Sequence, residues 1–162
     1  MKNVLIFGGT GFIGLHFIEY LLINMTFNCI YAIDIKDPVE PFRKKQYEGL
    51  KENKKIKFIK KDIRKTLLSL DVKDVDLILD FAAIHKEPGH NESEYYDTNV
   101  NGSKNICEFA KHVDCKNIIF TSSISVYGIG NHEKNESTRP RPSTPYGKSK
   151  LIAEENYINW QN

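Results

Sequence analysis

The sequence predicts an α/β fold, an open, doubly wound parallel sheet with helices on both faces. Short apolar runs of strand length alternate along the chain with longer segments in which apolar residues recur at helical spacing. The runs are continuously apolar, as expected for parallel strands that are covered on both faces. With 162 residues, of which 40% are hydrophobic and 27% charged, the chain is expected to form one domain over residues 1–162.

The predicted strands follow from these runs in chain order. The first strand covers residues 4–7, and a helix comes after it because Ile13, Phe17 and Leu21 recur at helical spacing. This connection is long enough for a crossover helix between parallel strands. The second to fifth strands are predicted, in order, at residues 29–33, 56–59, 77–83 and 118–120.

Two further helices are predicted in the second half of the chain. One covers about residues 94–112, and the last begins near Pro145, after a loop rich in proline, serine and threonine. Thr144 is the expected N-cap, because its hydroxyl can accept a backbone N–H and proline is favoured at the first helical position. In open α/β sheets ligands bind beyond the carboxyl ends of the strands, so we expect the site there.

The overall charge excludes two classes of partner. Lys plus Arg number 23 and Asp plus Glu number 21, and this balance predicts neither nucleic acid nor an anionic membrane as a partner. Residues 36–65 nevertheless hold twelve basic and five acidic residues. Two interpretations stay open for this stretch: a solvated helix and loop, or a patch that attracts a phosphorylated ligand.

The cysteine count and the apolar runs indicate a cytoplasmic protein. Cys29, Cys107 and Cys115 are odd in number and form no C-x-x-C pair, which favours reduced core thiols over a disulfide framework or a metal site. The apolar runs are too short to span a bilayer, and the N-terminus lacks the pattern of a signal peptide.

A glycine-rich loop follows the first predicted strand and opens the first predicted helix. Gly9, Gly11 and Gly14 match G-x-G-x-x-G, and Gly8, Gly11 and Gly14 match the related G-x-x-G-x-x-G. Glycine allows the tight turn, the approach of the backbone to a pyrophosphate, and close packing of the helix on the sheet. The helix N-terminus offers free N–H groups and a positive dipole end to the phosphates. This combination predicts a dinucleotide site in a Rossmann-type sheet.

Asp34 ends the second predicted strand, twenty residues after Gly14. Its carboxylate is placed to accept hydrogen bonds from the adenosine ribose hydroxyls and would repel a 2′-phosphate. The sequence therefore favours NAD over NADP, although Lys36 is close enough in the chain to soften that repulsion.

A serine, a tyrosine and a lysine are expected near the same crevice. Tyr146 and Lys150 lie four residues apart and so share one face of the last helix, while Ser122 and Ser123 follow the fifth strand. A free tyrosine, with a pKa of about 10, is a poor base at neutral pH, and a neighbouring ammonium favours its phenolate. The trio predicts removal of a hydroxyl proton by Tyr146 while hydride leaves for NAD, with Ser123 bonded to the same oxygen.

These motifs together resemble those of the extended short-chain dehydrogenases/reductases, specifically the NAD-dependent epimerase/dehydratase group that acts on nucleotide sugars. The matching residues are Gly8-Gly9-Thr10-Gly11-Phe12-Ile13-Gly14, Asp34, Asp62-Ile63, Phe81-Ala82-Ala83, Thr98-Asn99-Val100-Asn101-Gly102, Ser122-Ser123-Ile124-Ser125-Val126-Tyr127-Gly128 and Pro145-Tyr146-Gly147-Lys148-Ser149-Lys150.

The resemblance implies a cofactor role for several of these residues. Phe12 and Ile13 would offer their backbone amides to the pyrophosphate. Asp62 would contact the adenine amine, with Ile63 against the ring.

The same resemblance extends to the middle of the chain and to the last helix. Phe81, Ala82 and Ala83 would pass under the cofactor, and Thr98 or Asn99 would reach it from the long helix. Ser123, Tyr146 and Lys150 would be the catalytic set, and Lys150 would also bind the nicotinamide ribose.

Two departures from the family pattern shape the functional expectation. The dehydratases carry Thr-Asp-Glu where Ser123-Ile124-Ser125 stands here, which favours an epimerase or a simple dehydrogenase/reductase. Family members also continue beyond this point, so we expect a sheet truncated before the final strands and the C-terminal substrate lobe. The alternative is therefore a fragment that binds the cofactor without turnover. A nucleotide sugar is the expected substrate, and the two predicted later helices resemble the pair that forms the family's homodimer.

Overall fold

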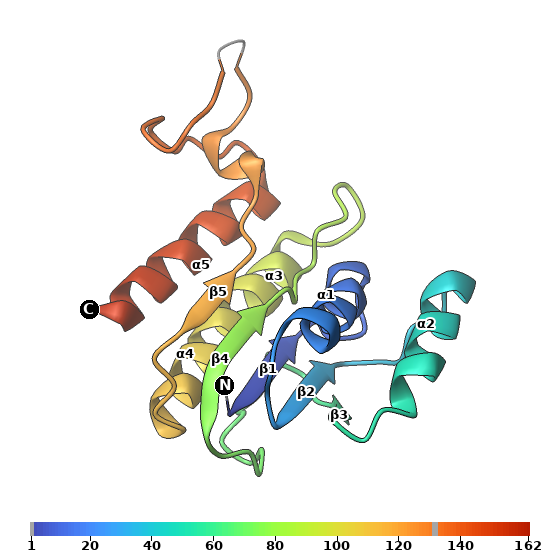
Figure 1. Cartoon of the computed structure of the whole chain (residues 1–162). Helices are drawn as coiled ribbons and strands as arrows, with labels where there is room; N and C mark the ends of the chain where they lie inside the picture. Colours follow the sequence, from blue (N-terminus) through green and yellow to red (C-terminus); the bar gives the residue numbers. More distant parts are fainter. Residues whose placement is uncertain (1, 131–132) are drawn as a thin grey trace.

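The computed structural model describes residues 2–130 and 133–162, and its centre is one parallel sheet of five strands (Figure 1). The strand order across the sheet is β3-β2-β1-β4-β5. The bounds of the strands are β1 (Asn3–Phe7), β2 (Cys29–Asp34), β3 (Ile56–Lys60), β4 (Val75–Asp80) and β5 (Ile118–Phe120). The expected doubly wound α/β fold is confirmed.

Helices cover both faces of this sheet. The helices, in chain order, are α1 (Phe12–Asn24), α2 (Pro41–Lys51), α3 (Glu92–Tyr95), the π-helical turn η1 (Tyr96–Asn101), α4 (Gly102–His112), the short 3-10 helix η2 (Ile124–Tyr127) and α5 (Pro145–Gln161). The segments α3, η1 and α4 follow one another without interruption, so they form the predicted long helix, which begins two residues earlier than expected. None of the helices in the described part of the chain combines the length and the apolar character needed to cross a bilayer.

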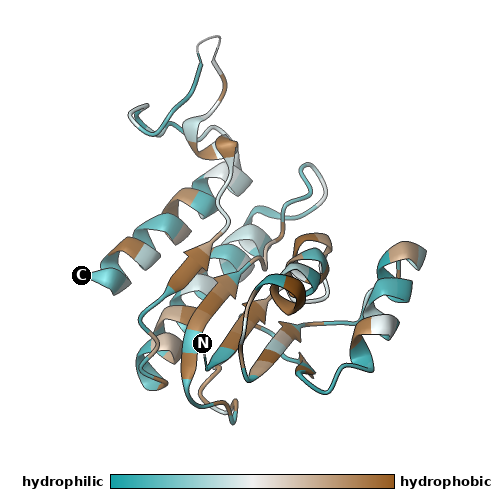
Figure 2. Cartoon of the chain, viewed as in Figure 1, coloured by the Kyte–Doolittle hydropathy of each residue, from teal (hydrophilic) through white to brown (hydrophobic). Residues whose placement is uncertain are grey.

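The alternation of side chains along β1 divides the core into two layers. Val4 and Ile6 pack with α1 and α2 on one face, whereas Leu5 and Phe7 pack with α4 and α5 on the other. All four are fully buried, as expected for a strand at the centre of a parallel sheet. The hydrophobic colour is concentrated on the strands of the sheet and on the helix α1 (Figure 2). The two edge strands differ from this expectation, because β3 and β5 keep partly or fully exposed positions, including Ile119 at 52% exposure.

Two features of the sheet were not expected from the sequence. The fourth strand was predicted over residues 77–83, but β4 begins at Val75 and ends at Asp80, and Phe81 to Ala83 continue beyond it as irregular backbone. The crossover from β3 to β4 was expected to follow the strand–helix alternation, but residues 61–74 contain no helix. Leu67 and Val72 from this segment are buried in the core, where a helix would otherwise supply apolar side chains.

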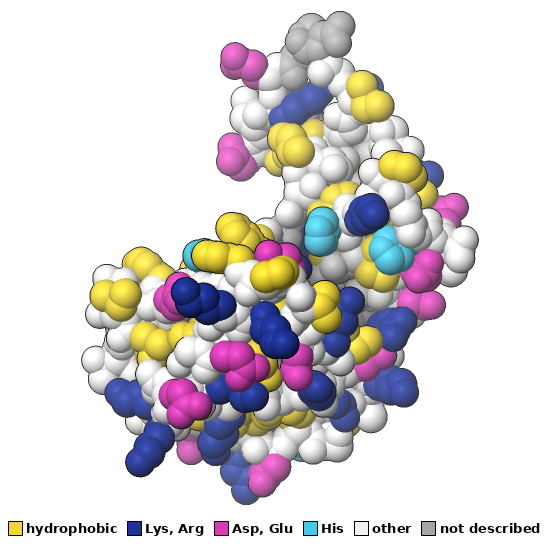
Figure 3. Space-filling view, turned by 90° about the vertical axis from the view of Figure 1, so that its right-hand side faces the viewer, with side chains coloured by type: hydrophobic (Ala, Val, Ile, Leu, Met, Phe, Trp, Pro, Cys, Tyr) yellow, Lys and Arg dark blue, Asp and Glu magenta, His cyan; other side chains and the backbone are white. Residues whose placement is uncertain are grey.

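The basic stretch at 36–65 contains α2 and β3. Its acidic side chains are largely engaged by neighbouring cations: Lys60 lies 3.0 Å from Asp37 and Arg43 lies 3.5 Å from Glu40. On the side of the molecule that carries α2, Lys and Arg side chains are mixed with acidic ones (Figure 3). This distribution is that of the solvated helix and loop, although an attraction for phosphorylated ligands stays untested. Cys29, Cys107 and Cys115 are free and buried, and burial raises the pKa of all three thiols.

Candidate active site

The glycine loop between β1 and α1 turns as tightly as its sequence predicts. Gly8 has a φ of 75°, a left-handed conformation that favours glycine, and its carbonyl accepts a 3.0 Å hydrogen bond from the N–H of Gly11. A Cβ at Gly14 would lie 2.3 Å from that same carbonyl oxygen. The third glycine of the motif therefore lets α1 approach the end of β1.

The N-terminus of α1 is left open to a ligand. Its N-cap is Gly11, which supplies no side-chain hydrogen bond, and the first turn holds no acidic residue. Among the described residues, the N–H groups of Phe12, Ile13 and Gly14 have no acceptor. By contrast, α2 and α5 are capped by the side chains of Glu40 and Thr144. Free N–H groups at the positive end of a helix dipole fit the pyrophosphate of a dinucleotide.

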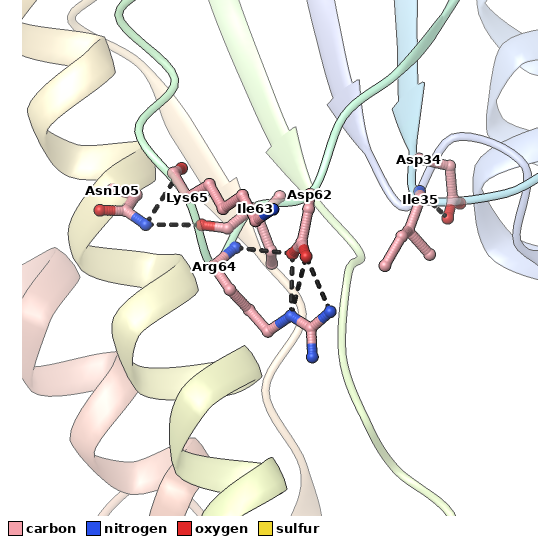
Figure 4. Close-up of polar contacts among 7 residues, drawn as sticks. All are labelled: Asp34, Ile35, Asp62, Ile63, Arg64, Lys65 and Asn105. Carbon is pink, nitrogen blue, oxygen red and sulfur yellow. Dashed lines mark hydrogen bonds and ion pairs between the residues drawn. The ribbon is translucent and has the colours of Figure 1, made fainter.

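Asp34 ends β2 beside this loop and is bonded to it. Its Oδ1 accepts from the N–H of Ile35 at 2.8 Å (Figure 4). Its Oδ2 accepts from the N–H of Thr10 at 3.1 Å. The Thr10 hydroxyl in turn donates to the carbonyl of Lys36 at 2.8 Å. Each carboxylate oxygen keeps a further lone pair, so the arrangement fits acceptance of ribose hydroxyls as well.

Asp62 and Ile63 lie in the loop after β3, where both are held by other residues. The Arg64 guanidinium donates hydrogen bonds to the Asp62 carboxylate, with Nε 2.9 Å from Oδ1 and Nη2 2.7 Å from Oδ2 (Figure 4). These bonds hold the pKa of the Asp62 carboxyl below its usual value. The Ile63 carbonyl accepts from Asn105 Nδ2 on α4 at 2.7 Å, and its side chain packs against Gly102. Any group that approaches the Asp62 carboxylate therefore also meets Arg64, a partner that sequence reasoning did not identify.

The segment after β4 lies beside the glycine loop. The N–H of Phe81 donates to the carbonyl of Phe7 at 2.9 Å, and the Phe81 ring packs against Phe17 of α1. A Cβ at Gly8 would lie 2.7 Å from the backbone N of Ala82. Ala83, next in the chain, is half-buried.

Thr98 and Asn99 belong to the π-helical turn η1. Thr98 is half-buried, whereas the Asn99 amide is buried and fully engaged. Asn99 accepts from the N–H of Ile84 at 3.0 Å and donates to the Ile84 carbonyl at 3.1 Å and to Ser149 Oγ at 2.9 Å. Asn99 therefore joins the segment after β4 to α5, and Thr98 is the more accessible of the two predicted cofactor contacts.

The proposed catalytic side chains come from η2 and from the first turns of α5. Ser123 is the N-cap of η2, and its Oγ accepts from the N–H of Ser125 at 3.2 Å. The predicted cap of α5 is confirmed, because Thr144 Oγ1 accepts from the N–H of Gly147 at 3.1 Å. A Cβ at Gly147 would lie 2.6 Å from the carbonyl oxygen of Ser125, so the helix turn that bears Tyr146 lies directly against the segment that bears Ser123.

Lys150 lies one turn after Tyr146, and only 2% of it is exposed. Its Nζ is 4.0 Å from the centre of the Phe120 ring, and burial lowers the pKa of the ammonium to about 8. A buried ammonium over an aromatic face, at the end of the last strand, is an unusual environment for a lysine.

Sequence reasoning missed two buried polar side chains next to Lys150. Asp80, the last residue of β4, is 3% exposed and accepts a 2.6 Å hydrogen bond from the hydroxyl of Tyr157 on α5. Burial raises the pKa of Asp80 to about 6, against the effects of the Tyr157 hydrogen bond and the Lys150 charge. Two signals were present in the sequence: an acid within an apolar run, and a tyrosine seven residues after Lys150 on the same helix face.

Comparison with known proteins identifies the same architecture. The model of the NAD dependent epimerase/dehydratase family matches residues 4–162. The N-acetyl-alpha-D-glucosaminyl-diphospho-ditrans,octacis-undecaprenol 4-epimerase of Escherichia coli O157:H7 is 34% identical over 161 residues, which cover 99% of this chain and 44% of that protein. A putative UDP-glucose 4-epimerase of Methanocaldococcus jannaschii is 33% identical over 165 residues, covering 98% of this chain and 50% of that protein.

A solved structure extends the likeness to three dimensions. The UDP-glucuronic acid 4-epimerase of Bacillus cereus, crystallised in complex with NAD, has a TM-score of 0.86 and 31% identity and covers 99% of this chain and 52% of its own. The chain therefore spans about half the length of the relatives it matches. The match over residues 4–162, together with the glycine loop and the strand order, places this chain in the NAD dependent epimerase/dehydratase family.

Proposed function

We propose that the protein is an NAD-dependent 4-epimerase of a sugar carried on a diphosphate. The proposal rests on two features that occur together: a glycine loop that leads into the uncapped N-terminus of α1, and Tyr146 and Lys150 on the first turns of α5. Parallel strands present their carboxyl ends at the same edge of the sheet, so the glycine loop and Ser123 flank one crevice. The N–H groups at the start of α1 would hold the phosphates of a dinucleotide in that crevice, and the side chains of α5 would lie beside its reactive ring.

The chemistry divides between the cofactor and the side chains of α5. NAD would supply reversible hydride transfer at the sugar carbon, and the residues of the chain would handle the proton. Tyr146 removes the proton of the sugar hydroxyl and later returns it, and the Ser123 hydroxyl donates a hydrogen bond to the same oxygen. Lys150 lies one helical turn after Tyr146 on the same face of α5 and would supply a positive charge beside this proton transfer.

The names of the relatives support a reaction at C4. The enzymes of Escherichia coli and Bacillus cereus and the putative enzyme of Methanocaldococcus jannaschii are all described as 4-epimerases. Their sugars differ, but each is carried on a diphosphate, as a nucleotide sugar or on a lipid. Ile124, which stands where the dehydratases carry an acid, is 68% exposed next to Ser123 and offers no carboxylate for the elimination of water. These points favour epimerisation over dehydration.

Incubation of the full-length protein with NAD and a panel of UDP-hexoses tests the proposal. Proton NMR of the anomeric signals is expected to show the C4 epimer, with no net formation of NADH. Release of a keto sugar with stoichiometric NADH would indicate a dehydrogenase, and a 4-keto-6-deoxy product would indicate a dehydratase.

Variants at two tyrosines assign the proton transfer. Tyr146→Phe removes only the phenolic oxygen and is expected to abolish hydride transfer while NADH binding changes little. Tyr20→Phe, at a tyrosine of α1 that is 55% exposed, is the matched control and is expected to retain activity. Retention of most of the wild-type rate in Tyr146→Phe would contradict the assignment.

Two further proposals concern the chain and its assembly. Since the relatives are about twice as long, we propose that the 162-residue chain by itself binds NAD with little turnover. We also propose a homodimer through α4 and α5, which lie side by side on one face of the sheet (Figure 1). Analytical sedimentation tests the dimer, and a purely monomeric protein would rule it out.

A further inference from the structure

A buried polar pair crosses from the central sheet to the helix that bears Tyr146. Asp80 sits in β4 between Phe7 of β1 and Phe120 of β5, its register partners on the two neighbouring strands. Its Oδ2 accepts from the Tyr157 hydroxyl at 2.6 Å and its Oδ1 from the N–H of Ala82 at 3.1 Å. Both carboxylate oxygens are therefore bonded, and the carboxylate has a fixed position in the α4–α5 layer of the core.

Lys150 shares this layer but makes no polar bond within it. None of the hydrogen bonds and ion pairs among the described residues involves its ammonium. Its Nζ lies over the Phe120 ring, and the centre of that ring is 4.8 Å from the centre of the Tyr157 ring. The ammonium, two aromatic rings tilted against each other and the Asp80 carboxylate thus follow one another across the core.

A charged lysine in such a layer needs a counter-charge. Transfer of an ammonium from water into a low-dielectric interior is costly, and a buried lysine responds by losing its proton unless an anion is near. The charged and titratable groups that face Lys150 and Asp80 are Glu154 and Tyr157 of α5, Cys107 of α4 and, acting on Cys107, Lys111. Of these, only Glu154 offers Lys150 a second negative charge, and it is less buried than Asp80.

We propose that Asp80, held in place by Tyr157, is a positioning residue that keeps the Lys150 amine charged and directed across the Phe120 ring beneath the candidate active site. The carboxylate acts through the field of its charge and touches neither sugar nor cofactor in this role. Salt screens the interaction between two buried charges only weakly, so the effect of Asp80 on the charge of Lys150 persists at high ionic strength. Its consequence for catalysis rests on the function proposed above for Lys150, whereas the charge of the amine is measurable without any turnover.

The test measures the protonation of Lys150 directly in the full-length protein. Lysine side chains are labelled with ¹³C and ¹⁵N, and the signal of Lys150 is assigned as the one absent from Lys150→Met. In the wild type the amine is expected to titrate near pH 8, which is the pKa that burial gives it. In Asp80→Asn, which keeps the shape and one of the two acceptor oxygens but not the charge, this titration is expected to move down by about one pH unit.

Two control variants separate the proposal from a general change in charge. Asp71→Asn removes one negative charge from an exposed position before β4, at the opposite end of the strand from Asp80, and is expected to leave the titration unchanged. Glu154→Gln is expected to shift the titration less than Asp80→Asn does. An unchanged titration in Asp80→Asn, or a larger shift in Glu154→Gln, would overturn the proposal.

The reciprocal measurement covers the case in which Asp80→Asn fails to fold. Because coupling between two charges is mutual, Lys150→Met must shift the titration of Asp80 by the same amount in the opposite sense. The ¹³C carboxyl signal of Asp80 is expected to titrate about one pH unit higher in Lys150→Met than in the wild type. An Asp80 titration that is identical in the two proteins would equally overturn the proposal, whatever the outcome for epimerase activity.

Discussion

Gly14→Ala tests whether the close approach of α1 to the end of β1 builds the cofactor site. A Cβ at this position would lie 2.3 Å from the Gly8 carbonyl oxygen and 2.8 Å from the Gly9 Cα. Both atoms belong to the backbone of the glycine loop, so the contact cannot be relieved by the rotation of a side chain. The helix and the loop must move apart.

The size of the effect follows from two opposing contributions. Overpacking of a tight interior contact costs about 1–3 kcal/mol, whereas replacement of glycine by alanine within a helix gains about 0.5–1 kcal/mol. The free energy of unfolding is therefore expected to fall by roughly 1–2 kcal/mol. For a domain of this size, each 1 kcal/mol lowers the melting temperature by about 2–4 °C.

Gly49→Ala provides a matched control within the same chain. Gly49 lies in α2, and a Cβ there meets nothing within 4 Å, so only the helix-propensity gain applies and the protein is expected to become slightly more stable. Urea denaturation followed by circular dichroism measures both variants. The quenching of NADH fluorescence measures cofactor binding, which Gly14→Ala is expected to weaken about tenfold because a loss of 1.4 kcal/mol corresponds to that factor.

The contradicting results are specific. Gly14→Ala with wild-type stability would show that the helix relaxes away from Gly8 without cost. Wild-type affinity for NADH in a destabilised Gly14→Ala protein would show that the free N–H groups of α1 do not bind the pyrophosphate.

Three further predictions follow from other parts of the site. NAD is expected to bind more tightly than NADP, and Asp34→Asn is expected to reduce this preference about tenfold, as titrations of both cofactors would show; equal binding of the two by the wild type would contradict it. The pKa of Asp80 is about 6 in the folded protein, against an ordinary value of 3.8. Between these two pH values the folded state therefore binds more protons than the unfolded state. The free energy of unfolding of the wild type should fall as pH rises from about 4 to about 6. The fall is up to about 3 kcal/mol relative to Asp80→Asn, and a constant difference between the two proteins across this range would refute it. The 162-residue chain is expected to epimerise a sugar at least about a hundredfold more slowly than a 4-epimerase of about twice its length, such as the Bacillus cereus relative, because positioning contributes several kcal/mol to such reactions; comparable kcat/KM values would contradict this.

Local spacing made the structure of the glycine loop and of the helix starts predictable. The turn at Gly8, the start of α1 and the end of β2 at Asp34 depend on residues that are close in sequence, and the Thr144 cap of α5 depends on a contact three residues away. Such features are set by the steric freedom of glycine and by side-chain bonds to nearby backbone groups, which the sequence displays directly.

Features that depend on distant contacts could not be read in this way. Asp80 and Tyr157 are 77 residues apart, and only the packing of α5 on the sheet brings them together. Tertiary contacts also set the end of β4 at Asp80, because the apolar run continues to Ala83 while the pairing of β4 with β1 and β5 stops at Asp80. Arg64 lies only two residues from Asp62, but it is not among the residues that carry the resemblance to the family.

The strand order joins the two halves of the candidate site through β4. Because β4 lies between β1 and β5, the residues that follow it pass beside the glycine loop, and the backbone of Phe81 and Ala82 leaves no room for a side chain at Gly8. Asp80, one residue earlier, faces the other layer and bonds α5 through Tyr157. A displacement of β4 therefore moves both the backbone that packs against the glycine loop and the Asp80 carboxylate near Lys150. A substitution at Asp80 should therefore alter the charge of Lys150 without weakening NAD binding only if the backbone after β4 stays in place. Measuring the Lys150 titration and NADH binding on the same variant separates the effect of the carboxylate charge from an effect on the position of β4.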